Sequence, residues 1–234
     1  MVDIDEQRAE ELASLCACPG SIDVADAMVL DAIDIVIVST INASIHPLVM
    51  EALRNKKHVL CEKPLGCNAA QAKAMVAAAE SSGCVLKTGF NHRHHPAIKQ
   101  AKALFDEGKI GELHFMRARY GHGGRHKGMR KNGVARELSG GGELLDQGVH
   151  ILDLFRWFAG NFKEVFAQTS TNYWNIQVED NAFAILKKDY LKLAPIFDFN
   201  DIKGVFADQA GWEVEQGIRH LKDGWDICSH VKML

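Results

Sequence analysis

Short apolar runs and longer amphipathic stretches alternate along the first 90 residues of the chain. Apolar residues at helical spacing predict helices over residues 5–15, 44–55 and 69–81. Short, mainly apolar runs predict strands over residues 33–38, 57–61 and 84–88, and the first of them is β-branched and nearly all apolar. Such runs are typical of strands buried on both faces, and their alternation with helices predicts an α/β fold with a doubly wound parallel sheet. Ligands are then expected at the carboxyl ends of the strands.

The pattern changes after residue 90. Helices are predicted over residues 96–107 and 143–158, and strands over residues 113–120, 163–173 and 181–188. This order indicates an α+β domain with an antiparallel sheet. We therefore divide the chain into two domains, residues 1–92 and residues 93–234.

Composition and charge exclude several classes of protein. Hydrophobic residues make up 47% of the 234 positions and charged residues 24%, which is typical of a globular protein. The net charge of −3 offers no basic excess for a nucleic acid backbone, so no nucleic acid partner is expected. The apolar runs are far shorter than the ~20 residues that span a bilayer. Because the acidic N-terminus also lacks a signal-peptide pattern, we predict a cytoplasmic protein without a membrane partner.

The cysteines and a cluster of histidines do not indicate a metal centre. The six cysteines have irregular spacing without a C-x-x-C pair, which favours incidental structural roles over zinc or disulfides. His92, His94 and His95 have no cysteine or carboxylate at ligand spacing, so a loop of partly solvated histidines is favoured and no metal is predicted.

Polar residues directly follow two of the predicted strands. After residues 33–38, small hydroxyl and amide side chains suit hydrogen bonding to a cofactor, although Ser44 can instead cap the next helix. The candidates at this strand are Ser39, Thr40, Asn42 and His46. After residues 57–61, a turn explains Pro64 but not the Glu62–Lys63 pair. A lysine beside a carboxylate can orient a hydroxyl and take part in proton transfer.

The helix predicted over residues 143–158 carries a third polar set. Asp146, His150 and Asp153 are four and three residues apart, so they share one face of the helix. Imidazole, with an unperturbed pKa of about 6.5, suits accepting the proton of an alcohol, and a carboxylate one turn away can orient it. The alternative is a polar stripe in water. The glycines at residues 140–142 can either hold an anion at the helix N-terminus or form a flexible turn.

The glycine motif of dinucleotide-binding folds, G-x-G-x-x-G, does not occur in the 234 residues. The nearest imitation, Gly121-x-Gly123-Gly124, lacks the third glycine and is not interpreted as a nucleotide loop. Around it, seven basic residues and no acid lie between residues 113 and 136, which favours a solvated loop over a site for an anionic sugar. They are Arg117, Arg119, Arg125, Lys127, Arg130, Lys131 and Arg136.

In this order the motifs resemble the Gfo/Idh/MocA oxidoreductases, the family of glucose-fructose oxidoreductase and inositol dehydrogenase. The resemblance spans about residues 3–186 and includes Gly89-Phe90-x-x-Arg93-x-x-Pro96. It implies a Rossmann domain that binds NAD or NADP, followed by a domain with an open antiparallel sheet that holds a sugar, cyclitol or related polyol and mediates homo-oligomer contacts. The implied reaction is hydride transfer between that substrate and the nicotinamide.

The resemblance also implies roles for individual residues. Lys63, Asp146 and His150 would be catalytic and, with Arg93, would contact the substrate. Asp3 would bind the ribose hydroxyls, which favours NAD over NADP. The other cofactor contacts would come from Ser39, Thr40, Asn42, His46, Glu62 and Lys63.

Both ends of the chain depart from the family pattern. If Asp3 is the ribose-binding acid, the glycine motif lies about 20 residues upstream. We therefore expect an N-terminal truncation that removes the first strand, the glycine loop and the first helix. After about residue 187 the resemblance fades, although a short helix is predicted over residues 212–221, so we expect an incomplete or altered second domain. Two alternatives stay open, namely a non-catalytic remnant unable to bind dinucleotide and an NAD-dependent glycosidase of the same family.

Overall fold

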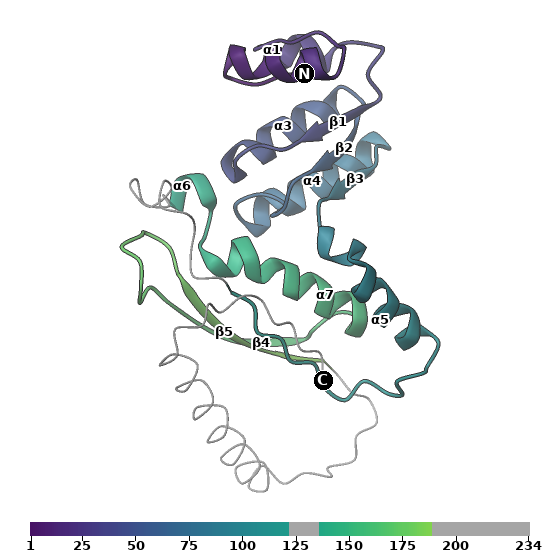
Figure 1. Cartoon of the computed structure of the whole chain (residues 1–234), viewed down its shortest axis with the longest axis vertical. Helices are drawn as coiled ribbons and strands as arrows, with labels where there is room; N and C mark the ends of the chain where they lie inside the picture. Colours follow the sequence, from purple (N-terminus) through teal and green to yellow (C-terminus); the bar gives the residue numbers. More distant parts are fainter. Residues whose placement is uncertain (122–135, 189–234) are drawn as a thin grey trace, which may run out of the picture.

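A three-stranded parallel sheet forms the centre of the N-terminal part (Figure 1). The computed structural model describes residues 1–121 and 136–188. The strands lie in the order β1 (Ile35–Val38), β2 (His58–Cys61), β3 (Leu86–Thr88), and they are connected by α3 (Asn42–Arg54) and α4 (Ala69–Ser82). Asn68 caps the start of α4, and Gly83 ends it with a left-handed φ of 70°. The predicted order of strands and helices is confirmed.

The core of this part lies on one face of the sheet. Ile45 and Val49 of α3, Met75 of α4 and Val59 of β2 are all at most 2% exposed. Because side chains alternate along a strand, the residues next to these core positions point to the opposite face. There Ile35 is 60% exposed and Ile37 70% exposed. The prediction that these strands are buried on both faces is therefore wrong, since only one face is covered by helices in the described structure.

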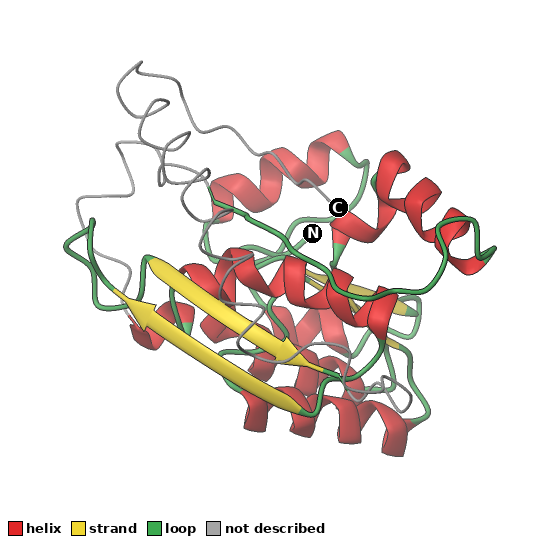
Figure 2. Cartoon of the chain, turned by 90° about the horizontal axis from the view of Figure 1, so that it is seen from below, coloured by secondary structure: helices red, strands yellow, loops and turns green. Residues whose placement is uncertain are grey.

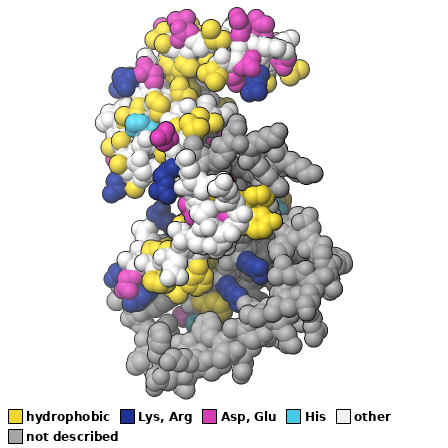
Figure 3. All heavy atoms as spheres, turned by 90° about the vertical axis from the view of Figure 1, so that its left-hand side faces the viewer, with side chains coloured by type: hydrophobic (Ala, Val, Ile, Leu, Met, Phe, Trp, Pro, Cys, Tyr) yellow, Lys and Arg dark blue, Asp and Glu magenta, His cyan; other side chains and the backbone are white. Residues whose placement is uncertain are grey.

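A small N-terminal unit lies beyond β1, the edge strand (Figure 1). Its helix α1 (Glu6–Leu15) begins at Asp5, whose side chain accepts a hydrogen bond from the Arg8 N–H. A parallel bridge between Val2 and Ser21 spans this helix. The short helix α2 (Val24–Met28) follows and was not predicted, because five residues are too few to show a helical period. In Figure 3, acidic side chains gather at the top of the molecule, the end formed by α1.

The segment that links the two parts confirms the helix predicted over residues 96–107 but not the strand predicted after it. It contains the 3₁₀ turn η1 (Asn91–His94) and the helix α5 (Pro96–Asp106), whose first residue is a proline, as is common at this position. The strand predicted over residues 113–120 is wrong. This stretch has no ladder partner in the part of the chain that the structure describes, and alternation alone does not make a strand.

The C-terminal part packs helices against a two-stranded antiparallel sheet (Figure 2). Its elements are α6 (Arg136–Ser139), the π-helical turn η2 (Leu144–Gly148), α7 (Val149–Ala159), β4 (Glu164–Ser170) and β5 (Asn181–Lys187). The two figures together show α7 between the two sheets. The helix and both strands predicted here are confirmed, whereas the π-helical turn was not predicted.

The loop between β4 and β5 is organised by one carboxylate. Asp180 accepts hydrogen bonds from the backbone N–H groups of Asn172, Tyr173 and Trp174 at 2.9, 2.7 and 2.7 Å. Burial alone would raise the pKa of this carboxyl, but the three N–H donors outweigh that effect and lower it to about 2. The carboxylate therefore fixes the turn.

Several predictions lie outside the described residues. They concern Gly123, Gly124, Arg125, Lys127, Arg130, Lys131, the helix over residues 212–221 and Cys228. The five remaining cysteines are free thiols, of which Cys61 is buried in the core. In the described ranges, the helices do not reach the length and apolarity that crossing a membrane requires.

Candidate active site

Lys63 and Asp146 meet where the two parts of the molecule join. Lys63 lies just past the carboxyl end of β2, and Asp146 lies in the π-helical turn η2. The Lys63 Nζ donates to Asp146 Oδ1 at 2.6 Å and to the Asp146 main-chain oxygen at 2.8 Å. The two side chains are 16% and 21% exposed, so the ion pair is largely shielded. The fold thus brings together two predicted site residues that lie far apart in the sequence.

His150 lies in the first turn of α7, one turn after Asp146, and is 6% exposed. Its Nδ1 is buried and makes no hydrogen bond within the described structure. The ring is instead held by aromatic neighbours. His92 stacks on it with ring centroids 4.1 Å apart and planes 27° apart, and Phe90 meets it edge-on at 6.3 Å. The sequence around His92 indicates only a partly solvated loop, because nothing local reveals a stacking partner on another element.

The surroundings of His150 favour its neutral form. Burial is the largest cause, and electrostatic repulsion by His92 and by the Lys63 ammonium acts in the same direction. The carboxylates of Asp146 and Asp153 oppose them but are weaker, so the pKa of His150 is lowered from 6.5 to about 4. At neutral pH the imidazole is uncharged and able to accept a proton.

Arg93 is held by a carboxylate of α7. Its Nε and Nη2 each donate to one oxygen of Asp153 at 2.6 Å, which is a bidentate pair. The guanidinium also lies 5.4 Å from the centre of the Trp157 ring. This geometry clamps η1 to α7 and uses two of the five donors of the Arg93 side chain.

The predicted cofactor contacts after β1 lie in three different environments. Asn42 begins α3, and its side-chain amide donates to the Ser139 main-chain oxygen at 2.9 Å, which links α3 to α6. Ser39 and Thr40 lie exposed at the carboxyl end of β1, and His46 lies within α3. The capping role considered for Ser44 is wrong. The helix starts at residue 42 after Ile41, which has no side-chain acceptor, and Ser44 lies inside the first turn.

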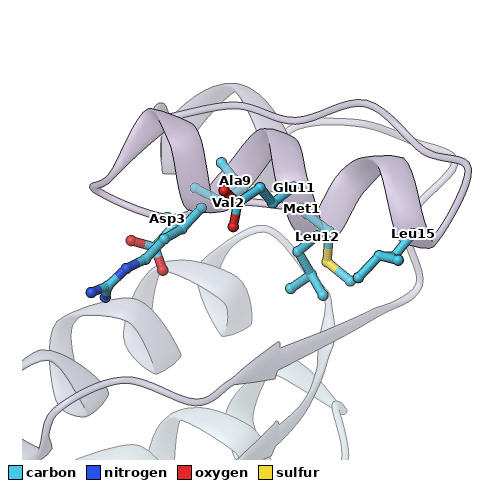
Figure 4. Close-up of a pocket in the computed structure, with 8 residues that line it drawn as sticks. Met1, Val2, Asp3, Ala9, Glu11, Leu12 and Leu15 are labelled. Atoms are coloured by element: carbon cyan, nitrogen blue, oxygen red, sulfur yellow. The ribbon is translucent and has the colours of Figure 1, made fainter.

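Glu62 and Asp3, both predicted cofactor contacts, lie in different parts of the molecule. Glu62 accepts a hydrogen bond from the Lys63 backbone N–H at 3.0 Å, beside the site. Asp3 lies in the N-terminal unit, where its Oδ1 accepts from the Asp5 N–H. Figure 4 shows it at a hollow of about 340 Å³ that α1 borders, with Met1 and Leu12 among the other lining residues.

The glycines at residues 140–142 pack tightly against other segments. A Cβ on Gly140 would lie 2.6 Å from Cys67, and one on Gly142 would lie 1.8 Å from the Glu179 main-chain oxygen. The Gly142 N–H donates to Glu179 Oε1 at 2.9 Å. The N–H group considered for an external anion is therefore engaged by a carboxylate of the chain itself. Close approach explains these glycines better than flexibility does.

The residues of this site fit one half of a nicotinamide dinucleotide. An ammonium group, a neutral imidazole and carboxylates meet at the carboxyl end of β2, where open α/β sheets bind ligands. This donor set suits a nicotinamide ribose and a substrate hydroxyl. The sequence holds no G-x-G-x-x-G loop for the diphosphate, so that half of a dinucleotide site has no counterpart among these residues.

Two family models match the chain. The model described as "Oxidoreductase family, NAD-binding Rossmann fold" matches residues 1–90, and the model described as "GFO/IDH/MocA C-terminal domain" matches residues 98–190. Trans-1,2-dihydrobenzene-1,2-diol dehydrogenase of Xenopus tropicalis is 37% identical over 118 residues, which are 50% of this chain and 34% of that protein. Levoglucosan dehydrogenase of Pseudarthrobacter phenanthrenivorans is 30% identical over 141 residues, 59% of this chain and 36% of that protein.

Solved structures give the same result. A levoglucosan dehydrogenase in complex with NADH and levoglucosan superposes with a TM-score of 0.72 at 25% identity, covering 80% of this chain and 53% of that one. The chain thus spans between 34% and 53% of the length of these three relatives.

Proposed function

The chain belongs to the Gfo/Idh/MocA family of oxidoreductases, and from this premise we propose that it serves NAD-dependent hydride transfer to or from a sugar, cyclitol or related polyol. The observation that carries the proposal is the meeting of Lys63, Asp146 and a neutral His150 at the carboxyl end of β2. These three residues supply what the oxidation of an alcohol needs from a protein, namely a proton acceptor and a cation that orients the hydroxyl.

Each side chain has a distinct role in this proposal. His150 accepts the hydroxyl proton as the carbon–hydrogen bond breaks, and it returns the proton in the reverse direction. Lys63 donates a hydrogen bond to the same hydroxyl, while Asp146 holds the ammonium in place through the contacts at 2.6 and 2.8 Å. NAD, when bound, supplies the hydride acceptor at C4 of the nicotinamide.

The wider assignments belong to the same proposal. Residues 1–92 form the cofactor domain and residues 93–234 the substrate and oligomer domain, with Asp3 favouring NAD over NADP. Arg93 supports the substrate side by clamping α7 through Asp153. Ser39, Thr40, Asn42, His46 and Glu62 would contribute cofactor contacts at or near the carboxyl ends of β1 and β2. We also propose a cytoplasmic homo-oligomer that does not bind nucleic acid.

A second candidate function concerns the 234 residues by themselves, which contain no G-x-G-x-x-G loop for the diphosphate. By themselves they would fold and yet hold no dinucleotide, and they would act at most as a partner-binding module.

Calorimetric titration of the 234-residue protein with NAD separates the two candidates. Micromolar binding supports the oxidoreductase and contradicts the second candidate, whereas a folded protein without detectable binding refutes the oxidoreductase. With a binding protein, NADH formation is followed over neutral and acidic sugars and cyclitols. His150→Ala is expected to lower turnover by about 10²–10⁴-fold while leaving NAD affinity unchanged. Unchanged turnover would remove His150 from the mechanism.

A further inference from the structure

His92 contacts the helix α7 and also Tyr120, which lies outside the helices and strands. Its ring lies flat on the His150 imidazole, with centroids 4.1 Å apart, and Tyr120 meets its edge at 5.5 Å with an interplanar angle of 74°. The next residue, Arg93, is bound bidentately by Asp153, one turn beyond His150 on α7. The Arg93–Asp153 ion pair and the His92–His150 stack therefore join the same two elements, η1 and α7.

The His150 ring lacks the usual means of orientation. Histidines that transfer protons are commonly fixed by a hydrogen bond from one ring nitrogen to a carboxylate or carbonyl. The Nδ1 of His150 is buried and makes no such bond within residues 1–121 and 136–188. Packing has to supply the orientation instead, and the His92 ring stacks on one face of the imidazole.

We propose that His92 is a positioning residue, whose ring shields one face of His150 from water and holds the imidazole neutral and correctly oriented for proton transfer. The proposal rests on the proposed function, in which His150 accepts the substrate proton. His92 itself contacts neither substrate nor cofactor in this scheme and acts through His150.

The charges around the pair agree with this role. Lys63 from the β2 end disfavours a positive charge on either ring, whereas Asp153 on α7 favours one. Asp146 of η2 favours a charge on His150, and His95, next to η1, disfavours one on His92. Burial, the largest influence, lowers the pKa of both imidazoles. Removing the His92 ring lets water reach His150, so the pKa of His150 is expected to rise.

The experiment compares His92→Ala with His92→Phe, which keeps a flat ring at the stacking position. NMR titration of the histidine ring signals of the full chain gives the pKa of His150 in each variant without any need for activity. We expect a value near 4 in the original protein, a rise of more than one pH unit in His92→Ala, and a clearly smaller rise in His92→Phe. If the alanine variant does not fold, His92→Gln replaces it, because it also removes the ring.

Kinetics provide an independent readout. The acidic limb of the kcat profile is expected to move to higher pH in His92→Ala, with the KM for NAD unchanged. An unaltered His150 titration in His92→Ala, or an equal rise in the alanine and phenylalanine variants, overturns the role of His92. A protein without NADH formation that nevertheless shows the graded titration shifts contradicts the proposed function and not the shielding by His92.

Discussion

The ion pair between Arg93 and Asp153 leads to a quantitative prediction for stability. In Arg93→Met the Asp153 carboxylate, whose side chain is 9% exposed, loses both of its 2.6 Å donors. Breaking a fully buried pair from one side costs about 3–5 kcal/mol. The Arg93 side chain is 38% exposed, so water can partly replace it. We therefore expect the free energy of unfolding to fall by about 2 kcal/mol.

Urea unfolding of four proteins isolates the pair itself. Arg93→Met, Asp153→Asn, the double variant and the original chain form a double-mutant cycle, with a coupling energy expected at about 1–2 kcal/mol. Arg93→Lys is the matched control, because it keeps the charge but loses the planar fork, and it should recover less than half of the coupling. A coupling energy below about 0.5 kcal/mol, which is typical of an exposed pair, would refute the idea that this clamp joins η1 to α7.

Three further predictions concern the site and its supports. The pKa of His150 is lower in the folded chain than in the unfolded one, so its stabilising effect is complete above pH 6.5 and is lost as the pH falls toward 4. Urea unfolding should show that the free energy of unfolding falls by about 2 kcal/mol between pH 7 and pH 5, and His150→Phe should abolish this loss. An equal loss in both proteins would contradict the assignment of the loss to His150. Asp180 has a lowered pKa of about 2, so Asp180→Asn should cost about 1 kcal/mol at pH 7 and progressively less as the pH falls from 4 toward 2, as measured by thermal unfolding. Gly142→Ala should cost about 3 kcal/mol, measured by urea unfolding, because its Cβ would overlap the Glu179 main-chain oxygen. Gly121→Ala is the neutral control, because a Cβ there meets no atom of the described residues within 4 Å.

Local patterns were sufficient for most of the regular structure. Two examples are the helical period of residues 69–81 and the apolar run of residues 57–61. In each segment the apolar residues pack against neighbouring elements, so their spacing indicates the type of element. The same reasoning failed for residues 113–120, because a strand depends on a partner that its own sequence does not specify. It also failed for Ile35 and Ile37, since an apolar run does not say which face the rest of the chain covers.

In the candidate site, too, local spacing predicted some features, whereas contacts between distant residues were not predicted. The spacing of Asp146 and His150 predicted that they lie on one face, and the motif around Lys63 indicated a cleft. The pairing of Arg93 with Asp153 joins residues 60 positions apart, and the stack of His92 on His150 joins two separate elements. Contacts of this kind arise from tertiary packing, so the periodicity of the sequence does not predict them.

The contacts of Lys63 have a stereochemical consequence. An ammonium group has three N–H bonds in a tetrahedral arrangement, and Asp146 takes two of them. With two N–H directions fixed, the third is fixed as well. The Lys63 ammonium, which otherwise rotates freely, therefore points its third N–H bond in one direction. A secondary alcohol bound there has one permitted direction for its oxygen lone pair, while His150 sets where its proton leaves. We therefore expect this pair of constraints to hold the hydroxyl of the bound alcohol in one orientation.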